Sequence, residues 1–301
     1  MQLRLMEYFV ALAREQHFAR AAIACNVSQP TLSMGIATLE RQLGRRLVER
    51  DRRYIGLTAE GHAALPWAQQ AIAAARSFRE AAPPRHRDLH GTLRLGAIPA
   101  AIPVTGYLTD ALQAAHPQVE LTIRSLTSRQ IAHGLAACEL DAGLTYLDHE
   151  PIADALRVAL YGDRFVFAAA AAATPIGRGA ITWREAVAAP LCLLHPDMQN
   201  RRILDEALAR SGLTATPRAT ADSHVTLVAL VRSGRFATIM PASYATLLPE
   251  WARVRPIDGG APPSARIGLV VPDRPPLPPL AQAALSAAEE LALPPEFGAP
   301  S

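Results

Sequence analysis

Polar side chains with regular spacing stand together near the amino end of the chain. They lie in CNVSQPTLSMGIATLERQLGRR, residues 25–46, where Ser28 can cap a helix and Pro30 falls in a first turn that needs no N–H donor from it. The candidate base-reading residues are Gln29, Pro30, Thr31, Ser33, Met34 and Thr38. Amide and hydroxyl groups on one face of a helix can hydrogen-bond to base edges in a DNA major groove, so we expect a sequence-reading helix here.

Arginines follow this helix and give the amino-terminal part of the chain its positive charge. Residues 1–90 hold 13 arginines against 8 acidic residues, whereas residues 91–301 hold 17 against 19. Guanidinium groups bind phosphates without reading sequence, but an arginine run alone fits a solvated surface equally well. Beside a predicted reading helix the DNA interpretation is favoured. The candidate phosphate contacts are Ser28, Arg41, Arg50, Arg52 and Arg53.

Three predicted helices and a hairpin would hold these side chains in place. A first amphipathic helix is predicted over residues 2–14 and an alanine-rich second helix over residues 19–25. The third helix carries a stripe of leucine and isoleucine at spacings of 4, 3 and 4 residues, which would face the core. Short apolar runs on both sides of the turn at residues 51–53 predict a wing. Residues 1–61 are therefore expected to form a winged helix-turn-helix.

A fourth helix, capped by Thr58, would leave this domain as a linker over residues 62–90, which contains a hinge at residues 83–84. Apolar residues recur along it at coiled-coil spacings of 3, 4 and 3 residues, at Leu65, Ala68, Ile72 and Ala75. This seam could pack against its own domain or pair with a second subunit. Because a long helix between two units suits subunit pairing, we expect a homodimer or homotetramer that presents its reading helices to paired half-sites.

Composition and motifs exclude several classes of protein. The length of 301 residues predicts more than one structural unit. Three cysteines without CxxC spacing argue against a disulfide framework or a zinc site, and no metal or cofactor is expected. The sequence has no GxSxG, P-loop or HExxH motif, so we do not expect an enzyme. It shows no signal peptide and no membrane-spanning run, which favours a cytoplasmic protein without a membrane partner.

From residue 91 the pattern changes to strands that alternate with helices. Repeated βα units predict parallel sheets with helices on both faces. Two sets of units predict an α/β region, residues 91–301, with lobe I over residues 91–160 and 266–301 and lobe II over residues 161–265. Ligands bind at the carboxyl ends of strands in such sheets, so the cleft between the lobes is the expected site of a small-molecule effector.

Loops that follow the predicted strands supply candidate effector contacts. They are Pro99, Ala100, Thr127, Ser128, Thr145, His195, Asn200, His224 and Pro241. Ser128 and Ser223 each begin a helix, where a hydroxyl and free N–H groups favour an anion, although each serine could equally act only as a cap. An anionic metabolite is therefore the leading hypothesis. A metal at His195 or His224 is disfavoured because no ligand spacing accompanies either residue.

The run FVALAREQHFARAAIACNVSQPTLSMGIATLERQLGRRLVER, followed by LTAEG, resembles the DNA-binding domain of LysR-type transcriptional regulators. The rest, including SHVTLVALVRSGRFATIMPAS, is similar to the effector domain of that family, which has the type 2 periplasmic-binding-protein fold. The resemblance implies a regulator whose partners are promoter DNA, a small effector and, as a further candidate, RNA polymerase. The alternative is a transport-type solute-binding module without a DNA role, which leaves the basic amino-terminal domain unexplained.

The sequence departs from the family pattern in places that bear on function. Gly35 follows Met34 where relatives commonly carry polar or basic residues, so it either permits close approach of the backbone to DNA or reflects sequence drift. Pro99 and Ala100 replace the usual Ser or Thr of the first loop, which implies a less polar pocket wall. LLHPDMQNRRILDEAL resembles the peroxide-sensing branch, but Asn200 stands about where a reactive cysteine would. Peroxide sensing through this loop is therefore disfavoured.

Overall fold

A computed structural model describes residues 2–50, 54–81, 89–171, 179–258 and 265–298. The turn at residues 51–53 and the hinge at residues 83–84 lie outside these ranges. The chain divides into two units, one built mainly from residues 1–89 and the other mainly from residues 90–301.

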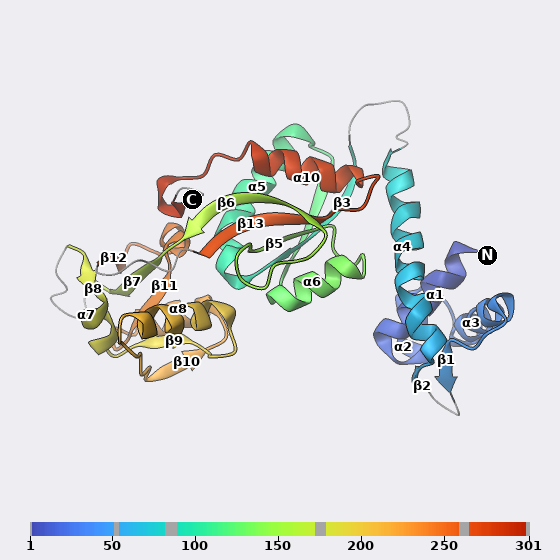
Figure 1. Cartoon of the computed structure of the whole chain (residues 1–301), viewed down its shortest axis with the longest axis horizontal. Coiled ribbons are helices and arrows are strands. Elements are labelled where there is room, and N and C mark those ends of the chain that lie inside the picture. Colours follow the sequence, from blue (N-terminus) through green and yellow to red (C-terminus); the bar gives the residue numbers. More distant parts are fainter. Residues whose placement is uncertain (1, 51–53, 82–88, 172–178, 259–264, 299–301) are drawn as a thin grey trace. The chain divides into compact units, whose positions relative to one another are not determined.

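The first unit is a winged helix-turn-helix followed by a long helix, as the sequence predicts (Figure 1). Its elements are α1 (Leu3–Glu15), α2 (Phe18–Ala24), α3 (Gln29–Leu43), β1 (Val48–Arg50), β2 (Tyr54–Leu57) and α4 (Ala59–Ala81). Asn26, with φ 54°, makes the left-handed turn between α2 and α3. Phe9, Leu12 and Leu32 are fully buried in the core, against which the start of α4 also packs. This core fixes the position of α3.

The first lobe of the second unit is a five-stranded sheet in the order β4-β3-β5-β13-β6. Its strands are β3 (Gly91–Ala97), β4 (Val119–Ser125), β5 (Ala142–Tyr146), β6 (Ala155–Asp163) and β13 (Ala265–Pro272). Its helices are α5 (Ile102–Ala115), α6 (Ser128–Ala136) and α10 (Pro279–Glu289), with short 3-10 turns η1 (Pro99–Ala101) and η3 (Pro295–Phe297). Figure 1 shows α5 and α10 on one face of this sheet and α6 on the other.

The second lobe contains a four-stranded sheet in the order β11-β7-β12-β8 and a parallel pair of β9 with β10. Its strands are β7 (Phe165–Ala170), β8 (Ile181–Thr182), β9 (Cys192–Leu194), β10 (Ala219–Ala221), β11 (Ala237–Pro241) and β12 (Ala252–Asp258). Its helices are α7 (Trp183–Ala188), α8 (Gln199–Arg210), α9 (His224–Arg232) and the 3-10 helix η2 (Ala242–Leu247).

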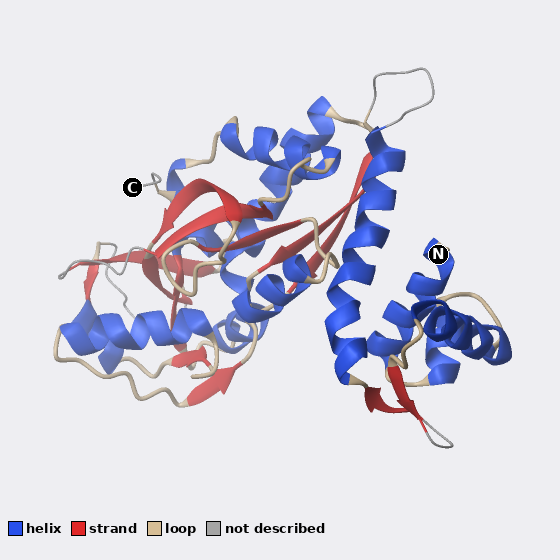
Figure 2. Ribbon diagram, turned by 45° about the vertical axis from the view of Figure 1, so that its right-hand side comes forward, coloured by secondary structure: helices blue, strands red, loops and turns tan. Residues whose placement is uncertain are grey.

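The sheets are mixed, which corrects the prediction of parallel sheets (Figure 2). β3 is parallel to β4 and β5, as expected from βα units, but β13 is antiparallel to both β5 and β6. In the second lobe β7 is antiparallel to β11 and β12. The chain passes from the first lobe to the second after β6 and returns at β13. Because β13 enters from the second lobe, it runs antiparallel to the neighbouring strands of the first lobe.

Candidate functional site

The helix α3 begins at Gln29 behind a capping serine. Ser28 Oγ accepts a hydrogen bond from the Thr31 N–H at 3.3 Å, and the two hydroxyls share another at 2.8 Å. These bonds satisfy donors that the first turn of a helix leaves free. On the opposite side Leu32, Ile36 and Leu39 are buried in the core, whereas Leu43, the last residue of the predicted stripe, is 41% exposed at the end of the helix. The cap and the buried side therefore hold the outward side of α3 in a fixed position.

The predicted base-reading residues lie on this outward side. Gln29, Pro30, Thr31 and Met34 are exposed, and Ser33 and Thr38 are half-buried. Arg41 Nη2 donates to Thr38 Oγ1 at 3.0 Å, which ties a predicted phosphate contact to a predicted base contact. Met34 keeps 68% of its surface exposed, so an apolar group projects among the polar ones. Such a group can contact a thymine methyl.

Gly35 lies on the buried side of α3, against α1. A Cβ at this position would lie 2.4 Å from Cδ2 of Tyr8, closer than real Cβ atoms approach. Tyr8 is buried, and its hydroxyl accepts a hydrogen bond from Arg4 Nε at 2.8 Å. The absence of a side chain at Gly35 thus makes room for the Tyr8 ring. Packing within the unit accounts for this glycine, a reading that neither sequence-based alternative included.

A buried carboxylate joins the start of the wing to α3. Glu40 Oε1 accepts hydrogen bonds from the Leu47 N–H at 2.9 Å and the Val48 N–H at 3.1 Å. Behind the wing, Thr58 Oγ1 donates to the Arg46 carbonyl at 2.7 Å and accepts from the Gly61 N–H at 2.9 Å. Sequence reasoning did not single out Glu40. Its only signal was an acidic residue among the apolar positions of the helix.

The predicted phosphate contacts are described only in part. Arg41 is exposed, and Ser28 uses its hydroxyl as the cap of α3. Arg50 belongs to β1, but its side chain is not described, and Arg52 and Arg53 lie outside the described residues.

The predicted seam of α4 faces two environments. Ala68 is buried in the core of the first unit, and Leu65 packs against that core. Ile72 and Ala75, farther along, are half-buried. Large apolar side chains are instead exposed elsewhere on the helix, with Trp67 at 72% and Phe78 at 76% of their surface. These two aromatic residues are eleven positions apart, which is about three helical turns, so they share one side of α4.

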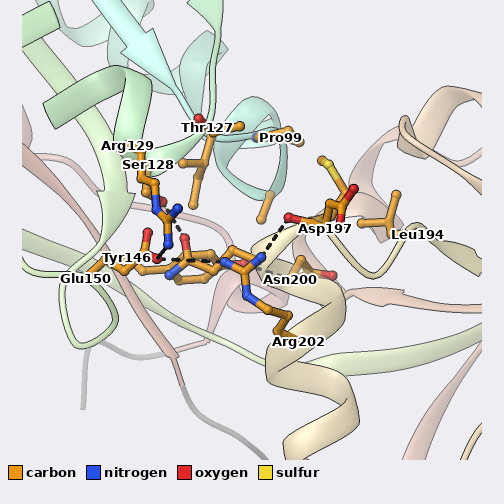
Figure 3. Close-up of a pocket in the computed structure, with 14 residues that line it drawn as sticks. Pro99, Thr127, Ser128, Arg129, Tyr146, Glu150, Leu194, Asp197, Asn200 and Arg202 are labelled. Carbon is orange, nitrogen blue, oxygen red and sulfur yellow. Dashed lines mark hydrogen bonds and ion pairs between the residues drawn. The ribbon is translucent and has the colours of Figure 1, made fainter. Parts of the chain in front are cut away.

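A cavity of about 370 Å³ lies between the two lobes, where β3 and β5 end (Figure 3). It is lined by five of the predicted effector residues, namely Pro99, Ala100, Thr127, Ser128 and Asn200. Tyr146, Glu150 and Arg202 also line it and were not predicted. Apolar side chains also line it, among them Ile98 from the first lobe and Met198 from the second. The cavity thus combines apolar side chains with convergent polar groups, as small-molecule sites usually do.

Two of the other predicted effector residues lie near the cavity but do not line it. Thr145 is buried, and its Oγ1 donates to Ser128 Oγ at 3.3 Å, so it supports a residue that does line the cavity. His195 is exposed, and its Nδ1 lies 3.2 Å from a carboxylate oxygen of Asp197.

The remaining two lie within the second lobe. His224 is buried, and its ring stacks on Tyr244 with centroids 4.1 Å apart. Burial lowers the pKa of His224 to about 4, and neither ring nitrogen has a hydrogen-bond partner in the described structure. Pro241 ends β11 and pairs with Phe165 of β7. Both residues pack inside the lobe. A position directly after a strand does not tell whether a residue lines a cavity or is packed in the core.

The first turn of α8 bonds to the first lobe across the cavity. Ser128 Oγ donates to Gln199 Oε1, and Gln199 Nε2 donates to the His149 carbonyl at 3.5 Å. Asn200 Nδ2 donates to the hydroxyl of Tyr146 at 3.0 Å. Burial raises the pKa of Tyr146 well above 10, so this phenol stays protonated and able to donate. Hydrogen bonds therefore join the two lobes at two places around the cavity.

A buried acid lies where the first lobe passes into the second. Asp163 ends β6 and is buried, and its Oδ1 has no hydrogen-bond partner in the described structure. Burial raises the pKa of this carboxyl well above 3.8, although the Arg164 N–H bonds to it and acts in the opposite direction. Loss of water disfavours the charged form, so the neutral acid is favoured.

The three cysteines lie away from the cavity lining. Cys192 is fully buried on β9, and burial raises the pKa of its thiol to about 11. Burial, as the largest cause, also raises the pKa of Cys25. Both shifts disfavour the nucleophilic thiolate. In the described residues we find no group of three or more metal-ligating side chains and no helix long and apolar enough to cross a membrane.

Comparison with known proteins finds family models that match both units. A model described as "Bacterial regulatory helix-turn-helix protein, lysR family" covers residues 3–62, and another described as "LysR substrate binding domain" covers residues 86–292. A Mycobacterium avium protein named "Probable hydrogen peroxide-inducible genes activator" is 32% identical over 87% of this chain and 85% of its own length.

Solved structures of similar proteins cover nearly the whole chain. A full-length OxyR from Pseudomonas aeruginosa has a TM-score of 0.71 at 27% identity, covering 97% of this chain and 99% of that one. Full-length CbnR in complex with its target DNA has a TM-score of 0.69 at 21% identity, covering 97% of this chain and 100% of that one. The second likeness concerns the fold alone.

Proposed function

Because the chain belongs to the LysR family of DNA-binding transcriptional regulators, we propose that α3 reads promoter DNA and that a small anionic effector between the two lobes modulates this binding. The chain is a regulator and not an enzyme. The proposal is carried by one observation, a capped helix with an exposed polar side in the same chain as a polar cavity. A transport-type module without a DNA role is not supported, since residues 3–62 match the DNA-binding model.

On DNA, we propose two classes of contact. The base-reading class is Gln29, Pro30, Thr31, Ser33, Met34 and Thr38, and the phosphate class is Ser28, Arg41, Arg50, Arg52 and Arg53. The first class is supported by its shared outward side, and the second by the excess of arginine in the first unit. Base contacts specify sequence, whereas phosphate contacts give affinity that falls as salt rises.

Titration of the purified protein on its own upstream DNA tests this division. Thr31→Ala or Ser33→Ala should change the preference among base-substituted sites, by about 1–3 kcal/mol at the affected base. Arg52→Ala with Arg53→Ala should weaken binding at every sequence and flatten the salt dependence. Arg232→Ala with Arg235→Ala, at two exposed arginines of the second unit, is the charge-matched control. Equal effects of both classes on every sequence would contradict the division, and no salt-sensitive DNA binding would contradict the function.

The chemistry of the effector is proposed from the cavity lining. Arg129 and Arg202 supply positive charge, and Tyr146 supplies a phenol that stays protonated. The apolar lining residues, such as Ile98 and Met198, suit a hydrocarbon body. A cavity of about 370 Å³ is at the small end of the usual range for ligand sites. These features favour a small organic acid with a carboxylate at one end.

Benzoate and succinate, with benzamide and succinamide as neutral counterparts, test the effector class. A carboxylate that binds the native state raises its melting temperature, because at a free ligand concentration c it adds a stabilising free energy of RT ln(1 + c/Kd). We expect the carboxylates to stabilise the protein more than the amides and to change its affinity for promoter DNA. By reciprocity, DNA must change the carboxylate affinity by the same factor. Equal responses to acids and amides would contradict an anionic effector.

We propose that the response does not run through a cavity thiol, although several relatives are named as hydrogen peroxide-inducible activators. The first turn of α8 carries Asn200 and no cysteine, and the pKa of buried Cys192 is about 11. A variant with Cys25, Cys138 and Cys192 changed to alanine should keep its DNA binding and its response to carboxylates. Hydrogen peroxide that altered DNA binding of the wild type but not of this variant would contradict the proposal.

We also propose a homodimer or homotetramer, with α4 as the pairing helix. Leu65 and Ala68 contact the core of their own unit, so the side with Trp67 and Phe78 is favoured for a partner helix. Trp67→Ala with Phe78→Ala should lower the mass measured by light scattering, whereas Val225→Ala, at an equally exposed apolar site, should not. An unchanged mass would contradict this seam. Action on promoter DNA in the cytoplasm, with RNA polymerase as a further partner, completes the proposal.

A further inference from the structure

Glu150 occupies an unusual place at the edge of the cavity. It lies in the loop between β5 and β6, and its side chain belongs to the cavity lining. Its backbone is left-handed, with φ 54°. Residues other than glycine, asparagine and aspartate rarely adopt this conformation because of steric crowding at Cβ. The loop therefore holds this glutamate in a strained position beside the cavity.

Arginines from both lobes meet this glutamate (Figure 3). Arg129 Nη2 in the first lobe lies 3.4 Å from Glu150 Oε1, and Arg202 Nη2 in the second lobe lies 3.8 Å from the same oxygen. Arg202 is also held by a 2.7 Å hydrogen bond from Nη1 to the Asp197 carbonyl. A single carboxylate oxygen thus bridges positive charges of the two lobes.

The other charged group of the lining is engaged elsewhere. The Asp197 carboxylate lies 3.2 Å from His195 Nδ1, and its side chain is 90% exposed. Other polar groups of the lining, such as Ser128 and Asn200, are neutral. The carboxylate that matches the two cavity arginines in the described structure is therefore that of Glu150.

The bridge is weak enough to exchange. The side chains of Arg129, Glu150 and Arg202 keep 85%, 36% and 45% of their surface exposed, so water screens their attraction. A ligand carboxylate could make the same charge contacts while its body also fills the apolar part of the cavity. Arginine binds a well-placed carboxylate through two parallel hydrogen bonds, which these long contacts to Glu150 do not achieve.

We propose that Glu150 is a built-in competitor for the effector. Its carboxylate occupies the subsite that the carboxylate of the effector takes, and effector binding displaces it from Arg129 and Arg202. The inference rests on the anionic effector proposed above. It adds that Glu150 sets the concentration at which the protein responds. In the bound state the carboxylate of the ligand, instead of Glu150, then interacts with the arginines of both lobes.

Calorimetric titration of the full-length protein with benzoate and benzamide tests this role. Glu150→Gln keeps the length of the side chain and the same backbone strain but removes the competing charge. We expect its Kd for benzoate to fall about threefold to fivefold, because the arginines no longer have an internal partner and an exposed ion pair contributes up to about 1 kcal/mol. Its affinity for benzamide should not change. Glu206→Gln, at an exposed residue of α8 outside the lining, removes the same charge and should leave both affinities unchanged.

Arg202→Gln distinguishes failure of the competitor role of Glu150 from failure of the anionic effector. If Arg202→Gln abolishes benzoate binding but Glu150→Gln binds benzoate no more tightly than the wild type, the competitor role is overturned and the anionic effector stands. An equal gain for benzamide in Glu150→Gln would also overturn the role, since it would show a general opening of the cavity. If neither benzoate nor succinate binds the wild type or Glu150→Gln, the anionic effector itself fails.

Discussion

The two units hold their polar side chains in different ways. On α3 the bonds are local, as between Ser28 and Thr31, so the outward side is complete without a partner. Around the cavity the bonds join separate lobes, as between Asn200 and Tyr146. A surface with local bonds is ready for a rigid partner such as duplex DNA. A cavity whose groups bond to one another must exchange those bonds for a ligand, and this exchange is what allows it to respond.

The largest expected effect would damage the first unit alone. A Cβ on Gly61 would lie 2.0 Å from the carbonyl oxygen of Leu47, a backbone atom that cannot rotate away. Gly61→Ala should therefore cost about 3 kcal/mol of stability and abolish promoter binding. Gly56→Ala, whose Cβ would meet nothing within 4 Å, is the matched control. Hydrogen exchange measured unit by unit should show loss of protection in the first unit only, and loss in both would break the comparison.

The second expected effect concerns the pH dependence of the stability of the second unit. The pKa of buried His224 is about 4 against an ordinary 6.5, so between these values the unfolded chain takes up a proton that the folded chain does not. The contribution of His224 to the free energy of unfolding is complete above pH 6.5. It is lost as pH falls from 6.5 to about 4, and the total loss is on the order of 3 kcal/mol. His224→Phe keeps the stacking ring and should remove this loss in urea titrations of the second unit. An unchanged acid slope would contradict the assignment.

A smaller effect concerns the packing of α3 on α1. Gly35→Ala should cost about 2 kcal/mol through contact with Tyr8, offset by about 1 kcal/mol of better helix propensity. The double variant Gly35→Ala with Tyr8→Leu should lose less than the sum of the single variants, because the smaller side chain yields space. Urea unfolding of the three variants measures this coupling. Strict additivity would show that the two residues do not compete for one space.

The smallest effect has the opposite pH slope. Since burial raises the pKa of Asp163, the folded chain keeps a proton that the unfolded chain has lost above its ordinary 3.8. Stability from this group therefore falls as pH rises through the raised pKa. Asp163→Asn should flatten that slope and slightly stabilise the second unit at neutral pH, whereas Asp110→Asn, at an exposed site, should do neither. A slope that persists in Asp163→Asn would contradict a buried neutral acid.

Local signals in the sequence predicted most of the first unit. The cap at Ser28, the start of α3 and the buried stripe depend on residues within a few positions of one another. Gly35 was different, because its reason is Tyr8, which lies on another helix. A pattern read along the chain cannot show which side chain will fill such a space.

The second unit was predicted less completely for the same reason. The βα repeats indicated two lobes, but the antiparallel direction of β13 depends on where the chain returns from the other lobe. The rule that ligands bind after strand ends correctly predicted Ser128 and Asn200 as lining residues. The same rule also selected His224, which is packed against Tyr244. Glu150 and Arg202 are distant in sequence, and only the folded chain brings them to one oxygen.

The Glu40 carboxylate has a consequence for the geometry of promoters. It binds the backbone at the start of β1 to α3, so the proposed DNA-reading helix and the base of the wing move as one rigid body. In a dimer that binds paired half-sites, any variation in the distance between them must then be absorbed outside this rigid body, along α4 or beyond it. Operators that differ in spacing should consequently keep the same footprint at each half-site.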